Sequence, residues 1–310
     1  MRFLKPDKSD RMSPILTDLI NTFGFLSRPR FWLRLGAVLV LTWHFTVAGL
    51  SWYYTSAILN PTCPPANDRR EGYQLVTLTT TDGAQLSGWW NPPKNGMVVI
   101  LLPGHAGNRD AMLPEAEFLI RNGYGILSLD SRGCSNQKAT LGYREAADAG
   151  EMLTFVLAQP EVEKVGVLGF SAGGVAAILS AEQHPQIQAV IAQGNYSDLA
   201  FEITNRTEAP SPLDWQMRHG VKLSMWAQIG VWPGNVNPLR TLKTLPPRPV
   251  LLVHGEKEAE NNRALQQYAA AREPKALWIV PGVGHGGYQQ AASAEYEQRI
   301  LSFFADSFAE

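Results

Sequence analysis

From the N-terminus onward, the pattern of hydrophobic and polar positions first predicts a membrane segment. Residues 35–59 contain no Asp, Glu, Lys or Arg, and such a run is long enough for one helix to cross a bilayer. Trp32 precedes the run and aromatic residues 52–54 lie near its end, where amphipathic rings favour the headgroup region. We therefore predict a transmembrane helix over residues 35–59, preceded by a tail at 1–34 and followed by a linker at 60–71.

Basic residues lie mainly on one side of this run. Seven precede it, whereas Arg69 and Arg70 follow it beside acidic neighbours. Because Lys and Arg concentrate on the cytoplasmic side of membrane segments, the N-terminus is expected in the cytoplasm and the rest of the chain beyond the membrane. A cleaved signal peptide is the alternative, but the run starts late, is long, and lacks a clear small-x-small cleavage site. Apolar spacing within 11–27 fits either a short helix on the membrane surface or a poorly ordered tail.

Beyond residue 72, short apolar runs alternate with helical patterns. The first two runs, 74–79 and 86–90, suit an antiparallel hairpin that turns at Asp82-Gly83. The later runs are continuously apolar and separated by helix-length segments, which is typical of a mostly parallel sheet covered by helices on both faces. The later strands are expected at 98–102, 125–129, 165–170, 189–193, 250–253 and 277–280, and the helices at 109–122, 142–158, 172–183, 260–272 and 293–308.

The segment 196–249 interrupts this alternation. An insertion of this length between two strands is commonly a functional cap rather than a structureless loop. We predict a helical cap whose large apolar side chains either line an acyl pocket or pack in the cap's own core. These side chains are Trp215, Met217, Met225, Trp226 and Trp232.

Composition then narrows the class of protein. Of the 310 residues, 45% are hydrophobic and 18% are charged, and the net charge is -1, which is typical of an ordered globular protein. No dominant basic block supplies the electrostatic footprint of nucleic-acid binding, so nucleic acid is not an expected partner. Cys63 and Cys134 lack the spacing of a disulfide framework or a zinc site. A single bridge between them is left open.

A candidate nucleophile lies between a predicted strand and a predicted helix. Gly169-Phe170-Ser171-Ala172-Gly173 matches G-x-S-x-G in the structural context that this motif requires. The small residues on either side of Ser171 let the strand and the helix approach closely at a sharp turn. A serine at the start of a helix is usually only a cap, but this context favours a nucleophile.

A base and an acid follow in the order that such a serine needs. The strand at 250–253 leads into a loop that contains Glu258, and the strand at 277–280 leads into a Gly-rich loop that contains His285. A serine hydroxyl is a poor nucleophile until a histidine accepts its proton and a carboxylate orients that histidine. The chain order serine, acid, histidine is therefore reproduced, with His285 as the expected base.

With these motifs, residues 72–310 resemble the α/β-hydrolase superfamily, in its serine esterase, lipase, thioesterase and aminopeptidase-like branch. LLPGHAGNRD resembles the loop after the family's third strand, LSLDSRG its turn after the fourth, and NPLRTLKTLPPRPVLLVHGEKE its approach to the acid. The resemblance implies a mostly parallel α/β-hydrolase sheet, an acyl-enzyme on Ser171, and the backbone N–H groups of His105 and Ala172 as oxyanion donors. It implies no metal and no organic cofactor.

The acid departs from the family's pattern. Where the family usually has Asp four residues after the histidine of its HG motif, here His254, this chain has Glu258. Glutamate can perform the task, because orienting an imidazole requires a fixed carboxylate rather than a particular stem length. Register favours Glu258, while Glu256, Glu260 and Asp198 stay open as alternatives.

Other charged residues have structural interpretations. Asp130 and Arg132 are expected to stabilise their turn as a pair, and Glu145 and Asp148 to be structural residues on a helix face. His254 is expected to be structural, as is the family's histidine at this place.

The expected substrate is a small acyl ester or thioester, amphiphilic or carrying an acyl chain, and the bilayer is the expected neighbour. An aminopeptidase-like amide hydrolase would use the same residues. The alternative from another class is a non-catalytic, membrane-tethered binding protein on the same fold, because fold does not establish function.

Overall fold

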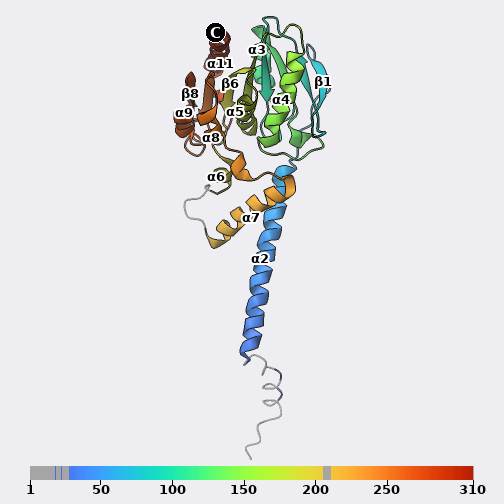
Figure 1. Cartoon of the computed structure of the whole chain (residues 1–310), viewed down its shortest axis with the longest axis vertical. Helices are drawn as coiled ribbons and strands as arrows, with labels where there is room; N and C mark the ends of the chain where they lie inside the picture. Colours follow the sequence, from blue (N-terminus) through green and yellow to red (C-terminus); the bar gives the residue numbers. More distant parts are fainter. Residues whose placement is uncertain (1–17, 19–21, 23–27, 205–210, 310) are drawn as a thin grey trace, which may run out of the picture. The chain divides into compact units, whose positions relative to one another are not determined.

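The structure is a computed structural model that describes residues 28–204 and 211–309, together with Asp18 and Thr22 (Figure 1). The chain divides into two compact units, Met1–Leu50 and Ser51–Glu310. Apart from Asp18 and Thr22, the segment at 11–27 lies outside the described residues.

The first long element is an uninterrupted helix, α2 (Pro29–Leu59). It begins at a proline, whose fixed φ suits the first position of a helix, and thus starts six residues before the predicted range 35–59. Its 31 residues rise roughly 46 Å at 1.5 Å per residue, more than the roughly 30 Å of a hydrocarbon core. Within the described residues, α2 alone is long and apolar enough to cross a membrane, a property that membrane spans share with signal sequences.

The second unit is built on an eight-stranded sheet with the order β1-β2-β4-β3-β5-β6-β7-β8. The first two strands form the predicted hairpin at one edge, β2 pairs antiparallel with β4, and all other pairs are parallel. The predicted fold class is therefore confirmed, and most strands begin or end a few residues beyond the predicted ranges. The strands are β1 (Gln74–Thr79), β2 (Gln85–Asn91), β3 (Met97–Leu102), β4 (Gly125–Leu129), β5 (Lys164–Phe170), β6 (Ile187–Gln193), β7 (Val250–Gly255) and β8 (Lys275–Val280).

Helices cover both faces of this sheet (Figure 1). Because successive side chains of a strand point to opposite faces, β3 supplies Val98 and Ile100 to one core, with α4, α5 and α8, and Val99 and Leu101 to the other, with α3 and α11. A buried parallel sheet of this kind presents its strand ends, rather than its faces, to ligands. The helices on the sheet are α3 (Leu113–Arg121), α4 (Tyr143–Leu157), α5 (Ala172–Gln183), α8 (Pro238–Thr244), α9 (Ala264–Ala270), α10 (Tyr288–Ala291) and α11 (Ser293–Ala309), and η2 (Arg132–Cys134) is a short 3-10 turn.

The insertion between β6 and β7 contains α6 (Leu199–Thr204), α7 (Pro212–Ile229), η3 (Pro233–Asn235) and α8. Figure 1 shows α6 and α7 beyond the ends of the strands rather than against the faces of the sheet. Met225 packs in the hydrophobic core, whereas Trp215 and Trp226 are 57% and 58% exposed. Of the apolar side chains expected in the cap, some are therefore buried in the core and others are exposed to solvent.

The pairing expected between Asp130 and Arg132 is wrong. Asp130 instead accepts hydrogen bonds from the Arg109 side chain, at 2.8 and 3.1 Å. Arg132 lies buried between Asp82 and Asp148, with its guanidinium 2.8 and 2.5 Å from their carboxylates. A turn brings neighbours in sequence close together, but here the partners come from the hairpin turn (Asp82), the loop after β3 (Arg109) and α4 (Asp148), which local spacing does not reveal.

Cys63 and Cys134 form a disulfide across 71 residues of sequence. It ties the segment after α2 to the turn η2 within the second unit. The bridge left open by the sequence is thus present.

Candidate active site

A sharp turn between β5 and α5 presents Ser171. The residue has φ 56° and ψ -119°, a conformation that costs free energy in a non-glycine residue and is typical of functional sites. A Cβ on Gly169 would come 2.1 Å from the carbonyl oxygen of Gly173, and one on Gly173 would come 2.1 Å from that of Leu102. Both glycines of the motif are therefore required by close backbone approach.

The structure brings Ser171, His285 and Glu258 together, although 114 and 27 residues separate consecutive members. The Ser171 hydroxyl lies 3.0 Å from Nε2 of His285. Nδ1 of His285 lies 2.6 Å from Oε2 of Glu258. With Nδ1 carrying the proton, Nε2 is free to accept the proton of the hydroxyl, which is the geometry of a serine activated by a base and an orienting acid.

Several donors hold the Glu258 carboxylate. Oε2 accepts from the side-chain amide of Asn262 at 3.0 Å, and Oε1 accepts from the backbone N–H of Gly255 at 3.1 Å and from the Tyr288 hydroxyl. Burial raises the pKa of Glu258, but the hydrogen bonds from His285, Tyr288 and Gly255 outweigh it, so the pKa lies below its ordinary value. The carboxylate is thus ionised at neutral pH.

The imidazole of His285 is positioned by packing as well as by Glu258. Its ring lies 4.9 Å from the ring of Phe170, centroid to centroid. Gly194 has φ 59°, and a Cβ there would come 2.6 Å from the Tyr288 hydroxyl and 3.2 Å from the His285 ring. Half of the His285 side chain is exposed, so the base can be reached from solvent.

The alternative acids lie elsewhere. Asp198 accepts from the backbone N–H of Phe201 at 2.8 Å and from the Asn237 side chain, so it caps α6. Glu256 accepts from the backbone N–H of Gly282 at 2.8 Å. Among the described interactions, Glu258 is the carboxylate that contacts His285.

His254 lies in the buried end of β7 and is fully shielded from solvent. Its Nε2 has no hydrogen-bond partner in the described part of the chain. Burial lowers the pKa of this imidazole to about 4, so it is neutral at physiological pH. His254 is therefore a buried, neutral residue at the end of β7.

The loop that carries His105 runs beside Ser171. A Cβ on Gly104 would come 3.2 Å from the Cβ of Ser171. Nε2 of His105 lies 2.6 Å from the carbonyl oxygen of Ile58, so the imidazole is engaged with the last turn of α2. Within the described residues, the backbone N–H groups of His105 and Ala172 donate to no protein acceptor, which leaves both available to a ligand.

Sequence reasoning missed Tyr288 and Asn262. Tyr288 follows His285 by three residues and Asn262 follows Glu258 by four, but neither belongs to the motifs. Both are buried and both donate to Glu258, which only the packing of the two loops reveals. In the described part of the chain, no group of three or more His, Cys, Asp or Glu residues is arranged to hold a metal ion.

Known proteins resemble this chain in sequence and in fold. A family model of the alpha/beta hydrolase fold matches residues 97–227. An esterase of Pyrococcus furiosus is 25% identical, with a TM-score of 0.65 over 80% of this chain and 99% of that chain. An uncharacterised protein of Mycobacterium tuberculosis is 27% identical over 218 residues, 68% of this chain and 71% of that protein. One of Pseudomonas aeruginosa is 40% identical over 70 residues, 23% of this chain but only 19% of that relative's length.

The sheet order, the turn at Ser171 and these similarities identify the fold as that of the α/β-hydrolases. An esterase among its structural neighbours supports hydrolase activity in general.

Proposed function

We propose that this protein is a serine hydrolase that cleaves carboxylic esters or thioesters through an acyl-enzyme on Ser171. The observation that carries the proposal is the continuous hydrogen-bonded chain from Ser171 through His285 to Glu258, with distances of 3.0 and 2.6 Å. An activated serine, a base with a free nitrogen and an ionised acid are the parts that acyl transfer needs.

In the proposed reaction, Oγ of Ser171 attacks the substrate carbonyl while Nε2 of His285 takes its proton. Glu258 stabilises the imidazolium, and the N–H groups of Ala172 and His105 hold the oxyanion, each worth about 3 kcal/mol in comparable sites. His285 then protonates the leaving alcohol or thiol, which leaves the acyl group on Ser171. Water, deprotonated by His285, then attacks the acyl-enzyme. The bond from the acyl carbon to Oγ of Ser171 breaks, the carboxylic acid is released, and His285 returns the proton to Oγ.

Labelling of the full chain in detergent micelles with a fluorophosphonate tests the nucleophile. The wild type should be labelled, and Ser171→Ala and His285→Ala should lose both labelling and ester hydrolysis while remaining folded, because either change removes the activated nucleophile. Ser135→Ala, a change in a surface turn, is the control that should keep both. Labelling of Ser171→Ala at the wild-type rate would refute the assignment, and a folded wild type without labelling or turnover would favour the non-catalytic alternative.

We further propose an apolar acyl chain in the substrate. The support is the apolar helix before the domain, which would hold the enzyme beside amphiphilic esters that carry acyl chains. Each buried methylene contributes about 0.8 kcal/mol, so kcat/KM should climb by about fourfold per carbon across a p-nitrophenyl ester series until the pocket is filled. A flat series, or preference for an aminoacyl amide, would favour the aminopeptidase-like alternative.

For location, we propose a single-pass membrane protein with a cytoplasmic N-terminus and the catalytic domain beyond the membrane. The excess of basic residues before the uncharged run 35–59 supports this orientation. The Cys63–Cys134 disulfide supports it too, since such bonds persist in oxidising compartments. Protease added outside intact cells or spheroplasts should digest the domain. Cys63 and Cys134 should not react with maleimide until their disulfide is reduced. A protected domain with reactive thiols would reverse the orientation.

A further inference from the structure

Helix α7 carries an apolar face that the fold does not use. Trp215, His219, Leu223 and Trp226 follow one another at three- or four-residue spacing and therefore lie on one side of the helix. Leu223, Trp215 and Trp226 are between 57% and 58% exposed, and the rings of Trp215 and His219 pack 4.2 Å apart. We call these four residues the α7 stripe.

The opposite side of α7 is occupied. Val221, Met225 and Ile229 are buried, and Gly220 lies so close to Ser51 that a Cβ there would come 2.2 Å from the Ser51 hydroxyl. The stripe is therefore not a displaced core face, because α7 already has one. A contiguous exposed apolar row, unlike single exposed residues, points to an interaction site.

The last turns of α2 lie beside α7 within the second unit. The Ser51 hydroxyl lies 3.4 Å from the Met217 carbonyl oxygen, and the Ser56 hydroxyl lies 3.0 Å from the Gln228 side-chain oxygen. Gln228 also donates to the carbonyl oxygen of Trp52 at 3.3 Å. The stripe is thus fastened to the end of the apolar helix, where Trp52, Tyr53 and Tyr54 are themselves 49%, 75% and 53% exposed.

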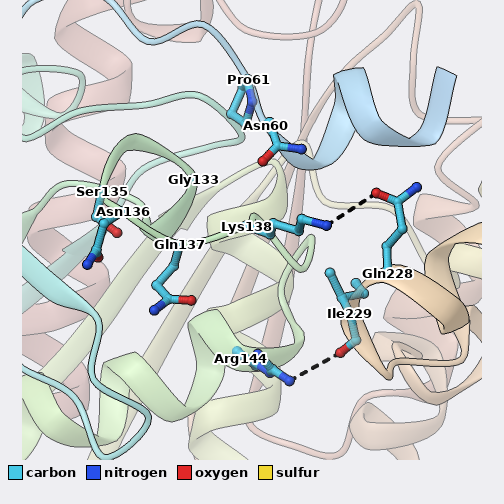
Figure 2. A pocket seen from close by; sticks show the side chains of 10 residues that line it. All are labelled: Asn60, Pro61, Gly133, Ser135, Asn136, Gln137, Lys138, Arg144, Gln228 and Ile229. Atoms are coloured by element: carbon cyan, nitrogen blue, oxygen red, sulfur yellow. Dashed lines mark hydrogen bonds between the residues drawn. The ribbon is translucent and has the colours of Figure 1, made fainter. Parts of the chain in front are cut away.

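A polar cavity of about 640 Å³ adjoins the C-terminal end of α7. Lys138 donates to the Gln228 side chain at 3.3 Å, and Arg144 donates to the carbonyl oxygen of Ile229 at 3.1 Å (Figure 2). Asn60 and Gln137 add amide groups to the wall, and no carboxylate belongs to the lining. Arg144 also lies 3.7 Å from the Asp82 carboxylate, outside the lining, but Asp82 is shared with Arg132. Two cations among amides suit an anion with several oxygen acceptors, such as a phosphate group.

We propose that α7 lies in the interface of the bilayer, with the α7 stripe against the acyl chains and the Lys138–Arg144 cavity open to phosphate-bearing lipid headgroups. This proposal rests on the proposed anchoring by α2. Tryptophan and leucine on one face, with Arg218 and Lys222 on the same helix, are the composition of helices that lie in the headgroup region. The exposed aromatic rings at the end of α2 favour the same depth. The bilayer is the occupant rather than a second copy of the chain, because α7 is held against the helix that would enter the membrane.

Depth-dependent fluorescence quenching in the full chain tests the position of α7. Both native cysteines are in the disulfide, so one added cysteine is the only site for a nitrobenzoxadiazole label. Leu223→Cys reports on the stripe, Leu41→Cys on α2, and Leu265→Cys, at an exposed residue of α9, on solvent. In vesicles that contain nitroxide-labelled lipid, labels at 223 and 41 should be quenched and blue-shifted, whereas the label at 265 should be neither.

Three other outcomes of the quenching experiment each have a single interpretation. Quenching at 41 without quenching at 223 overturns the proposal and leaves the anchor intact. A blue-shifted label at 223 that lipid does not quench identifies a second copy or another protein as the occupant, which also overturns it. Absence of quenching at 41 refutes the anchor itself, on which the proposal rests, whereas esterase activity of the same samples tests the catalytic proposal separately.

The cavity is tested by the relative association of spin-labelled phosphatidylglycerol and phosphatidylcholine with the full chain. The Lys138→Gln/Arg144→Gln double variant should lower the preference for phosphatidylglycerol by about fivefold or more, because each basic side chain near anionic lipid contributes favourably. Lys94→Gln/Lys243→Gln removes the same charge from exposed sites and should keep the preference. Equal loss in both variants, or loss of the preference when millimolar inorganic phosphate is added, overturns the assignment of the cavity to a lipid headgroup.

Discussion

Four hydrogen bonds converge on Glu258, from His285, Tyr288, Asn262 and the N–H of Gly255. A carboxylate held from this many directions has one orientation, and orientation is what the acid of such a site contributes. Each donor also stabilises the ionised form, which keeps the pKa of Glu258 below its ordinary value.

Replacing each candidate acid by its neutral amide tests which carboxylate orients His285. Glu258→Gln should lower kcat by roughly 10⁴-fold, because the imidazole loses its orienting charge and correct tautomer. Glu256→Gln, Glu260→Gln and Asp198→Asn should stay within a few-fold of wild type, since none of these carboxylates contacts His285. Ester turnover with thermal stability as the control is the measurement, and a severe loss in Asp198→Asn with a mild one in Glu258→Gln would reverse the assignment.

In the proposed mechanism, Tyr288 acts through Glu258 as a positioning residue. Tyr288→Phe removes one donor to the carboxylate, so kcat/KM should fall by about tenfold. The carboxylate also becomes more basic and holds the imidazolium more tightly, so the acid limb of the pH profile should move to higher pH. Tyr296→Phe is the matched control, because that buried hydroxyl bonds to Glu115 and Gln193 instead. If both variants lose stability and neither shifts the limb, Tyr288 is only structural.

At the scale of elements, the turn from β5 to α5 is set by backbone contact. Gly173→Ala would place a methyl group 2.1 Å from the carbonyl oxygen of Leu102, and overpacking against backbone costs about 3 kcal/mol or more. Gly284→Ala, in the His285 loop, meets nothing within 4 Å and should leave the melting temperature unchanged. Thermal unfolding followed by circular dichroism distinguishes them, and a Gly173→Ala variant as stable as wild type would contradict the packing described for this turn.

At the scale of the whole molecule, His254 makes stability depend on pH. Its pKa is about 4 in the folded protein and roughly 6.5 when unfolded, so between these values the unfolded chain binds the additional proton. The contribution of His254 to the free energy of unfolding is therefore complete above pH 6.5. It falls as the pH drops and levels off below pH 4, a total loss of about 3 kcal/mol.

Comparing the wild type with a His254 variant separates the contribution of this imidazole to acid stability from that of the carboxylates. Between pH 7 and 4.5, the free energy of unfolding of His254→Gln should fall by about 2 to 3 kcal/mol less than that of the wild type. His184→Gln, at a partly exposed histidine, should track the wild type. Parallel melting curves for wild type and His254→Gln across this range would show that the buried imidazole does not govern acid stability.

The sequence by itself determined the alternation of strands and helices and the place of Ser171, Glu258 and His285 at strand ends. The physical reason is local: buried strands must be apolar, a sharp strand-to-helix turn needs glycine, and parallel strands end at one edge of the sheet. The long helix before the domain follows in the same way from an uninterrupted apolar run.

Only the tertiary structure decided which side chains meet. Arg132 bonds to Asp82 and Asp148 rather than to Asp130, and Tyr288 and Asn262 reach Glu258 from outside any motif. The disulfide and the exposed row on α7 likewise depend on how distant segments pack. Sequence periodicity reports which face of an element is apolar, but the partner of a buried charge and the covering of an apolar face are fixed when the elements assemble.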